Sequence, residues 1–173
     1  MTSALLHGGT STVCAIGHPP DALAWKVAIE YPLGEEAGEG FSQTWPQSPS
    51  TEPSTQSDAP SLVVAIVALK DEALSVSAIW GKSFRVEGRT YGHVLDPRTG
   101  RPASRASLAA VILPSATETD AFPTALLTVG VRSHNKIANL RPGMRTLVVA
   151  RRCLGSSFNW RSSGIEVSEQ MSS

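Results

Sequence analysis

Apolar and polar residues alternate most regularly between residues 24 and 32. The apolar positions are Trp25, Val27, Ile29 and Tyr31, and Lys26, Ala28 and Glu30 lie between them. Successive side chains of a β-strand point to opposite faces, so this pattern predicts a half-buried strand that ends at a proline.

A different pattern, a nearly continuous run of apolar and mostly β-branched residues, extends from residue 61 to residue 69. Such a run is typical of a central strand that is covered on both faces. A Gly at the second turn position also predicts a hairpin around Glu87-Gly88. Further strands are predicted on both sides of the Gly8-Gly9 break and at residues 73–80, 83–86, 89–95, 107–114 and 144–152.

One segment, residues 120–130, has the spacing of an amphipathic helix. Its apolar face would contain Ala121, Ala125, Leu126 and Val129. We expect Asp120 to be the N-cap, Pro123 to lie in the first turn and Gly130 to follow the last turn. The strands and this helix predict an α+β fold with a mixed, largely antiparallel sheet and one or two packed helices.

The composition of residues 34–60 differs from that of a globular domain. Residues 34–60 are rich in Ser, Pro, Gly, Glu and Gln, a composition that buries too little apolar surface to offset chain entropy. We therefore expect a disordered insertion there. Only 17% of the residues are charged, against about 25% in average proteins.

The balance of charges argues against a polyanionic partner. The chain has 15 Lys and Arg against 15 Asp and Glu, so no net field attracts nucleic acid or an anionic membrane. The chain has two cysteines, Cys14 and Cys153, which are too few for a disulfide framework but sufficient for a single disulfide bridge. No apolar run reaches the about 18 residues that a transmembrane helix needs.

The segment from His93 to Gly100 has the composition of a tight turn. Asp96, Pro97 and Gly100 stand at the positions that turn geometry favours, and this alone explains them. His93 has two interpretations, a structural histidine or a side chain that exchanges protons in a cleft.

Asp120 and Thr124 are four residues apart and would lie on one face of the predicted helix. Carboxylate and hydroxyl oxygens are hard ligands that suit Mg²⁺ or Ca²⁺. The alternative interpretation is that Asp120 only caps the helix and that Thr124 has no special role.

The order of these motifs resembles that of the ApbE family, the FAD:protein FMN transferases. The resemblance rests on the Gly8-Gly9 strand, the Trp25 strand, the segment Ser75 to Ala78, and above all on "YGHVLDPRTG" and "DAFPTALLTVG". It implies a T-fold-like domain of which these residues are the C-terminal half. It also implies that FAD is the substrate and that FMN is moved onto a Ser or Thr of an acceptor flavoprotein, with release of AMP.

Residue roles follow from the same resemblance. It implies that Asp120 and Thr124 bind a catalytic Mg²⁺, that Val94 contacts FAD, and that His93 lies by the diphosphate as general base. Arg98 or Arg101 could help to hold phosphate.

The chain departs from the family pattern in three ways. Ala78 stands where the family has Gly, and Pro123 replaces a residue that is commonly small or acidic. The family's N-terminal half, with most FAD contacts, has no counterpart here, so we expect an incomplete copy. The expected parts are the start of an ApbE-like domain at 1–33, the insertion at 34–60, the remainder of the domain at 61–161 and a flexible tail at 162–173.

Two classes of function are compatible with these observations. The first is an Mg²⁺-dependent flavin transferase, or the C-terminal part of one. The second is a catalytically inactive flavin-binding or structural remnant of the family. Family resemblance suggests a location in the bacterial cell envelope, on the periplasmic side of the inner membrane, with the cytoplasm as the alternative.

Overall fold

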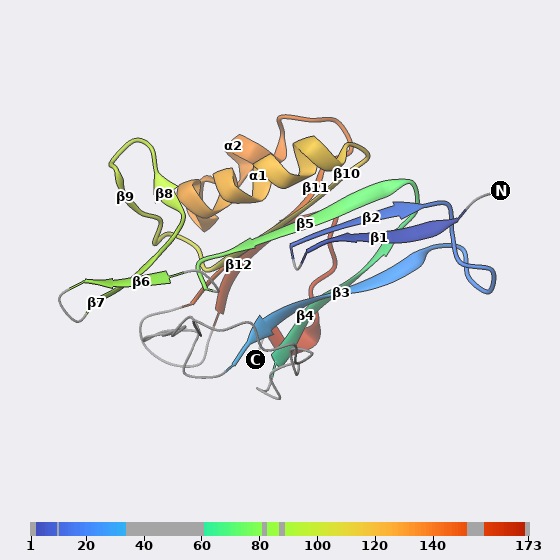
Figure 1. Ribbon diagram of the computed structural model, residues 1–173, viewed down its shortest axis with the longest axis horizontal. Helices are drawn as coiled ribbons and strands as arrows, with labels where there is room; N and C mark the ends of the chain where they lie inside the picture. The colour runs from blue at the N-terminus through green and yellow to red at the C-terminus, as the bar shows by residue number, and fades with distance from the viewer. Residues whose placement is uncertain are drawn as a thin grey trace, which may run out of the picture.

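The computed structural model describes residues 3–9, 11–33, 61–80, 83–86, 89–151 and 158–171. These residues form three layers (Figure 1). A six-stranded sheet lies in the middle, a helix packs on one face and a two-stranded sheet packs on the other. The predicted insertion at 34–60 lies outside the described residues.

The large sheet is antiparallel at every pairing. It consists, in spatial order, of β1 (Ala4–Gly8), β2 (Thr12–Ile16), β5 (Glu72–Ala78), β10 (Leu108–Leu113), β11 (Arg145–Arg151) and β12 (Phe158–Ser163). Three smaller pairs are β3 (Trp25–Pro32) with β4 (Ser61–Leu69), β6 (Ser83–Val86) with β7 (Arg89–Gly92), and β8 (Leu95–Asp96) with β9 (Arg101–Pro102). The α+β class and the largely antiparallel sheet are confirmed.

The alternation in β3 is confirmed residue by residue. Ile29 and Tyr31 are buried, Trp25 and Val27 are half-buried, and the residues between them are exposed. The register against β4 shifts between Ile29 and Glu30, which is a β-bulge. The extra residue is Val64 of β4, which has no Cα partner on β3, and Ile29 and Glu30 on the facing strand border the pocket described below.

The strand buried on both faces is β10, whereas we predicted β4. In β4, Ile66 is 63% exposed and burial alternates towards the C-terminal end, because only one face of the strand packs against the large sheet. Every residue of β10 is buried. Leu108, Ala110 and Ile112 pack with the β3–β4 layer, and Ala109, Val111 and Leu113 pack with the helix layer.

The main helix, α1 (Ala116–Val129), begins earlier than predicted. Its N-cap is Ser115, whose hydroxyl accepts a hydrogen bond from the Glu118 backbone N at 3.4 Å, so the prediction that Asp120 caps the helix is wrong. The pattern Ser-x-x-Glu before an apolar segment is the sequence signal for this cap. Gly130 follows the last turn, as predicted.

This longer helix places Pro123 in its interior rather than in its first turn. A proline there removes one backbone hydrogen bond, a loss that packing must offset. The buried residues of α1 are Thr119, Pro123, Leu126 and Leu127, whereas Ala121 of the predicted apolar face is exposed.

The chain from residue 162 to residue 173 was predicted to be a flexible tail. Up to Met171 it instead lies on the molecule: Ser162 and Ser163 belong to β12, and Ile165 and Met171 are buried. Ser168 donates from its hydroxyl to the Val63 backbone O at 2.7 Å. The remaining helical segments are short, α2 (Asn135–Ala138) and the 3-10 turns Val131–Ser133 and Glu169–Met171.

Candidate active site

A close backbone contact positions His93 and Val94. A Cβ added to Gly92 would lie 2.9 Å from the Ile79 carbonyl oxygen, so a side chain there would force the backbone apart. Val94 is buried, and its carbonyl accepts a hydrogen bond from the Ala103 N at 2.8 Å. His93 is exposed between these two restrained neighbours.

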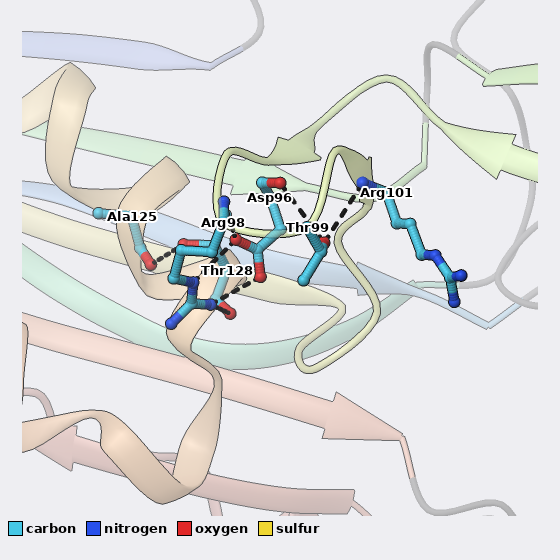
Figure 2. A network of polar contacts seen from close by, with 6 residues as sticks. All are labelled: Asp96, Arg98, Thr99, Arg101, Ala125 and Thr128. Atoms are coloured by element: carbon cyan, nitrogen blue, oxygen red, sulfur yellow. Dashed lines mark hydrogen bonds and ion pairs between the residues drawn. The ribbon is translucent and has the colours of Figure 1, made fainter.

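Asp96 organises the turn that follows (Figure 2). Its Oδ1 accepts from the backbone N and the Nε of Arg98 at 3.0 and 2.8 Å, and its Oδ2 accepts from Arg98 Nη2 at 2.7 Å. The Gly100 N donates to the Asp96 carbonyl at 2.8 Å, with φ of 64° at Gly100. The turn predicted from these residue types is therefore confirmed.

Arg98 also attaches this turn to the helix. Its Nη2 donates to the Thr128 backbone O at 2.9 Å, in the last turn of α1, where a cation is favoured by the helix dipole. The Arg98 guanidinium is therefore occupied by protein groups and is poorly placed to hold phosphate. Arg101 enters the network of Figure 2 through its backbone N, which donates to Thr99 Oγ1 at 3.3 Å. Neither arginine is among the described residues that line the pocket.

The hydrogen bonds from Arg98 favour the ionised form of Asp96. The side-chain bond, followed by the backbone bond, lowers the pKa of Asp96 to about 2. The carboxylate therefore stays ionised over the neutral and mildly acidic range, and the ion pair that attaches the turn to α1 persists there.

A pocket of about 760 Å³ brings the four predicted site residues together. Its walls come from β3, β5, α1 and the segment before β8. The lining residues are Ser11, Ala28, Ile29, Glu30, Val76, Ser77, Ala78, Trp80, His93, Val94, Leu108, Asp120 and Thr124. Binding sites for small molecules typically have volumes of roughly 300 to 1,000 Å³.

Hydroxyl groups of the sheet hold the two polar residues of α1. Thr12 Oγ1 and Ser75 Oγ each donate to Asp120 Oδ1 at 3.2 Å. One turn along the helix, Thr124 Oγ1 lies 3.2 Å from Ser77 Oγ. Thr12, Ser75 and Ser77 were not predicted as neighbours of the site. The alternating hydroxyls of "SVS" on a predicted strand were a usable signal for Ser75 and Ser77.

The donor set suits a hard cation. Asp120 supplies a carboxylate and Thr124 a hydroxyl, and both side chains are exposed in the pocket. The part of the chain that the structure describes contains no group of three His, Cys, Asp or Glu residues able to hold a metal. Mg²⁺ is usually bound through one or two carboxylates together with water and substrate phosphates, so the residues present fit that ion.

Three layers of an α+β fold thus line a pocket of mixed polarity with a histidine on one wall and a carboxylate and a hydroxyl on another. The sequence profile described as the ApbE family matches residues 1–148, and the chain belongs to this family.

Curated relatives carry the name FAD:protein FMN transferase. The protein from Escherichia coli (strain K12) is 26% identical over 144 residues, which are 82% of this chain and 33% of the relative. The protein from Klebsiella pneumoniae (strain 342) is 32% identical over 74 residues, 42% of this chain and 21% of that relative. The chain therefore spans about a third of the Escherichia coli relative.

Solved structures of the family share the fold. The apo form of the Pseudomonas stutzeri flavinyl transferase ApbE has a TM-score of 0.60 and 26% identity, covering 94% of this chain and 42% of that one. The ApbE protein from Thermotoga maritima has a TM-score of 0.60 at 22% identity, covering 98% of this chain and 44% of that one. Among the described residues, no helix combines the length and apolar character needed to cross a membrane.

Proposed function

We propose that this chain contributes the metal-binding and proton-accepting part of an Mg²⁺-dependent FAD:protein FMN transferase. The substrates would be FAD and a Ser or Thr hydroxyl of an acceptor flavoprotein. The acceptor oxygen forms a bond to the FMN phosphorus, the bond from that phosphorus to the AMP oxygen breaks, and AMP leaves.

One observation carries the proposal: four residues chosen from two sequence motifs line a single pocket. His93 and Val94 come from the segment before β8, and Asp120 and Thr124 come from α1. Asp120 is also not needed as a helix cap, because Ser115 has that role. The alternative explanation of Asp120 as a capping residue is thereby removed.

Each residue would have a distinct part in the reaction. Asp120 and Thr124 would hold Mg²⁺, which supplies electrostatic stabilisation to the diphosphate and to the leaving AMP. His93 would accept the proton of the acceptor hydroxyl, a role for which its exposure in the pocket is suitable. Val94, a largely buried residue of the pocket lining, would present an apolar contact to FAD.

The second candidate function is an inactive flavin-binding protein. In that protein the same pocket would bind FAD without releasing AMP. The two functions share the pocket and differ in turnover.

The test incubates the chain with FAD, Mg²⁺ and an acceptor flavoprotein that carries a Ser or Thr site. AMP is measured by chromatography, and the gain of FMN on the acceptor by mass spectrometry. We expect Asp120→Ala to abolish Mg²⁺-dependent AMP release and His93→Ala to slow transfer more than it weakens FAD binding.

Glu118→Ala is the matched control, because Glu118 is a carboxylate of the same helix that pairs with Arg141 outside the pocket. It should retain AMP release. Unchanged release by Asp120→Ala would remove Asp120 from the metal site. FAD binding without any AMP release by the unmodified chain would overturn the transferase proposal in favour of the inactive flavin-binding protein.

A further inference from the structure

A triangle of oxygen atoms connects β2, β5 and α1 beside the pocket. Thr12 and Ser75 are Cα partners in the antiparallel pair of β2 and β5, so their side chains lie on the same face of the sheet. Their hydroxyls are 3.1 Å apart, and each lies 3.2 Å from Oδ1 of Asp120. Two strands thus hold one carboxylate oxygen of the helix.

The two oxygens of Asp120 are therefore not equivalent. Each hydroxyl has a single hydrogen to donate, and Oδ1 can accept from both Thr12 and Ser75. Among the residues that the structure describes, none donates a hydrogen bond to Oδ2. With Oδ1 restrained, Oδ2 keeps its lone pairs for a ligand in the pocket.

The spacing of the hydroxyls on β5 matches the spacing of the residues on α1. Ser75 and Ser77 lie two positions apart on one face of the strand, a distance of about 6.6 Å. Asp120 and Thr124 lie four positions apart on the helix, a rise of about 6 Å. Ser75 therefore faces Asp120 while Ser77 faces Thr124, with the 3.2 Å contacts given above.

We propose that Thr12 and Ser75 are positioning residues that orient the Asp120 carboxylate so that Oδ2 binds the divalent cation. The inference rests on the proposed function, because it presupposes that Asp120 is a metal ligand. Hydrogen bonds to a metal-binding carboxylate fix its orientation, and their loss typically weakens metal binding by about 10- to 100-fold.

A purely structural role predicts something different for Ser75. Its side chain is fully buried, so its hydroxyl needs a partner in any case. Replacement by Ala removes that need together with the hydroxyl. A structural hydroxyl would thus affect the melting temperature only, whereas a positioning hydroxyl affects metal affinity.

The test measures the dissociation constant of Mn²⁺ by electron paramagnetic resonance, with FAD present, for the full chain and its variants. Ser75→Ala and the nearly isosteric Thr12→Val should each weaken Mn²⁺ binding at least about tenfold. Thr12→Ser keeps a hydroxyl and should restore binding close to that of the unmodified chain. If Ser75→Ala does not fold, the comparison of Thr12→Val with Thr12→Ser tests the proposal by itself, because Thr12 is only half-buried.

Ser107→Ala is the matched control. Ser107 is also buried, and its hydroxyl donates to the Val149 backbone O at 3.1 Å, away from Asp120. Its loss should leave Mn²⁺ affinity unchanged. Wild-type Mn²⁺ affinity in Ser75→Ala and Thr12→Val, alongside weakened binding in Asp120→Ala, would overturn this inference alone. Absence of Mn²⁺ binding by the unmodified chain would overturn both this inference and the metal role in the proposed function.

Discussion

At the scale of single residues, the motifs "YGHVLDPRTG" and "DAFPTALLTVG" each contain an aspartate, Asp96 and Asp120. The two aspartates have different hydrogen-bond partners and therefore different roles. Both oxygens of Asp96 are engaged by Arg98, and its pKa is lowered to about 2. Asp120 has only hydroxyl partners at Oδ1 and faces the pocket. Asp96 therefore stabilises the turn, and Asp120 is the residue available to a ligand.

The first prediction concerns the ion pair of Asp96 and Arg98. The pKa of Asp96 is lowered from about 4 in the unfolded chain to about 2 in the folded one, so its stabilising contribution is complete above about pH 4 and is lost as pH falls towards 2. We expect Arg98→Ala to lower the melting temperature at neutral pH. The difference from the unmodified chain should shrink between about pH 4 and pH 2.

Thermal unfolding followed by circular dichroism across this pH range measures the effect. Arg101→Ala is the control, because Arg101 enters the turn network through its backbone N. A difference between Arg98→Ala and the unmodified chain that stays constant with pH would show that the Asp96 charge is not responsible.

The second prediction concerns the backbone contact beside His93. In Gly92→Ala the new Cβ would meet the Ile79 carbonyl at 2.9 Å, and overpacking of this kind costs about 1 to 3 kcal/mol. The variant should lose stability in chemical denaturation and bind FAD more weakly. Gly8→Ala, whose Cβ would have only ordinary contacts at 3.7 Å, should remain close to the unmodified chain. Equal stability of the two variants would contradict this account of the segment.

At the scale of elements, α1 decides how the site is presented. Because the helix begins after Ser115, Asp120 and Thr124 lie within it on a common face, where the hydroxyls of β5 and β2 reach them. In a helix that began at Asp120, the carboxylate would instead accept hydrogen bonds from the backbone N–H groups of the first turn. The position of the cap therefore determines whether Asp120 can serve a ligand.

The third prediction tests this cap. Ser115→Ala removes the acceptor for the Glu118 N and should cost about 1 kcal/mol of the free energy of unfolding. Ser115→Asn keeps a capping oxygen and should stay near the unmodified chain, as measured by urea denaturation. Equal stability of Ser115→Ala and Ser115→Asn would mean that the hydroxyl does not cap α1.

Features whose local sequence pattern agrees with their final environment were predicted correctly. The alternation of β3 and the turn at Asp96 are local, and both were predicted. The burial of β10 and the exposure of Ile66 depend on which layer covers each strand, which residue type alone does not determine. Both Ser61–Leu69 and Leu108–Leu113 are apolar runs, and only their neighbours distinguish them.

The residues of the candidate site also differ in whether a local sequence pattern reveals them. Asp120, Thr124, His93 and Val94 were predicted from motifs, and the structure brings all four to one pocket. Thr12 was missed because its contact with Asp120 spans 108 positions in the sequence. Pairing of β2 with β5 creates that contact, and strand pairing over such distances is not encoded in any local pattern.

At the scale of the whole molecule, the pocket depends on three layers. The β3–β4 layer contributes Ala28, Ile29 and Glu30, the large sheet contributes β5, and the opposite layer contributes α1. The two hydrophobic cores lie on either side of β10, which is buried in both. These cores hold the walls in place, so the pocket is a product of the fold as well as of its motifs.

The most direct test is a crystal structure of the chain grown with FAD and Mn²⁺, with data collected for the anomalous signal of manganese. We predict an anomalous peak beside Oδ2 of Asp120 and Oγ1 of Thr124, with the FAD diphosphate in the same pocket next to His93. A manganese peak elsewhere on the molecule, or FAD bound outside the pocket, would contradict the account.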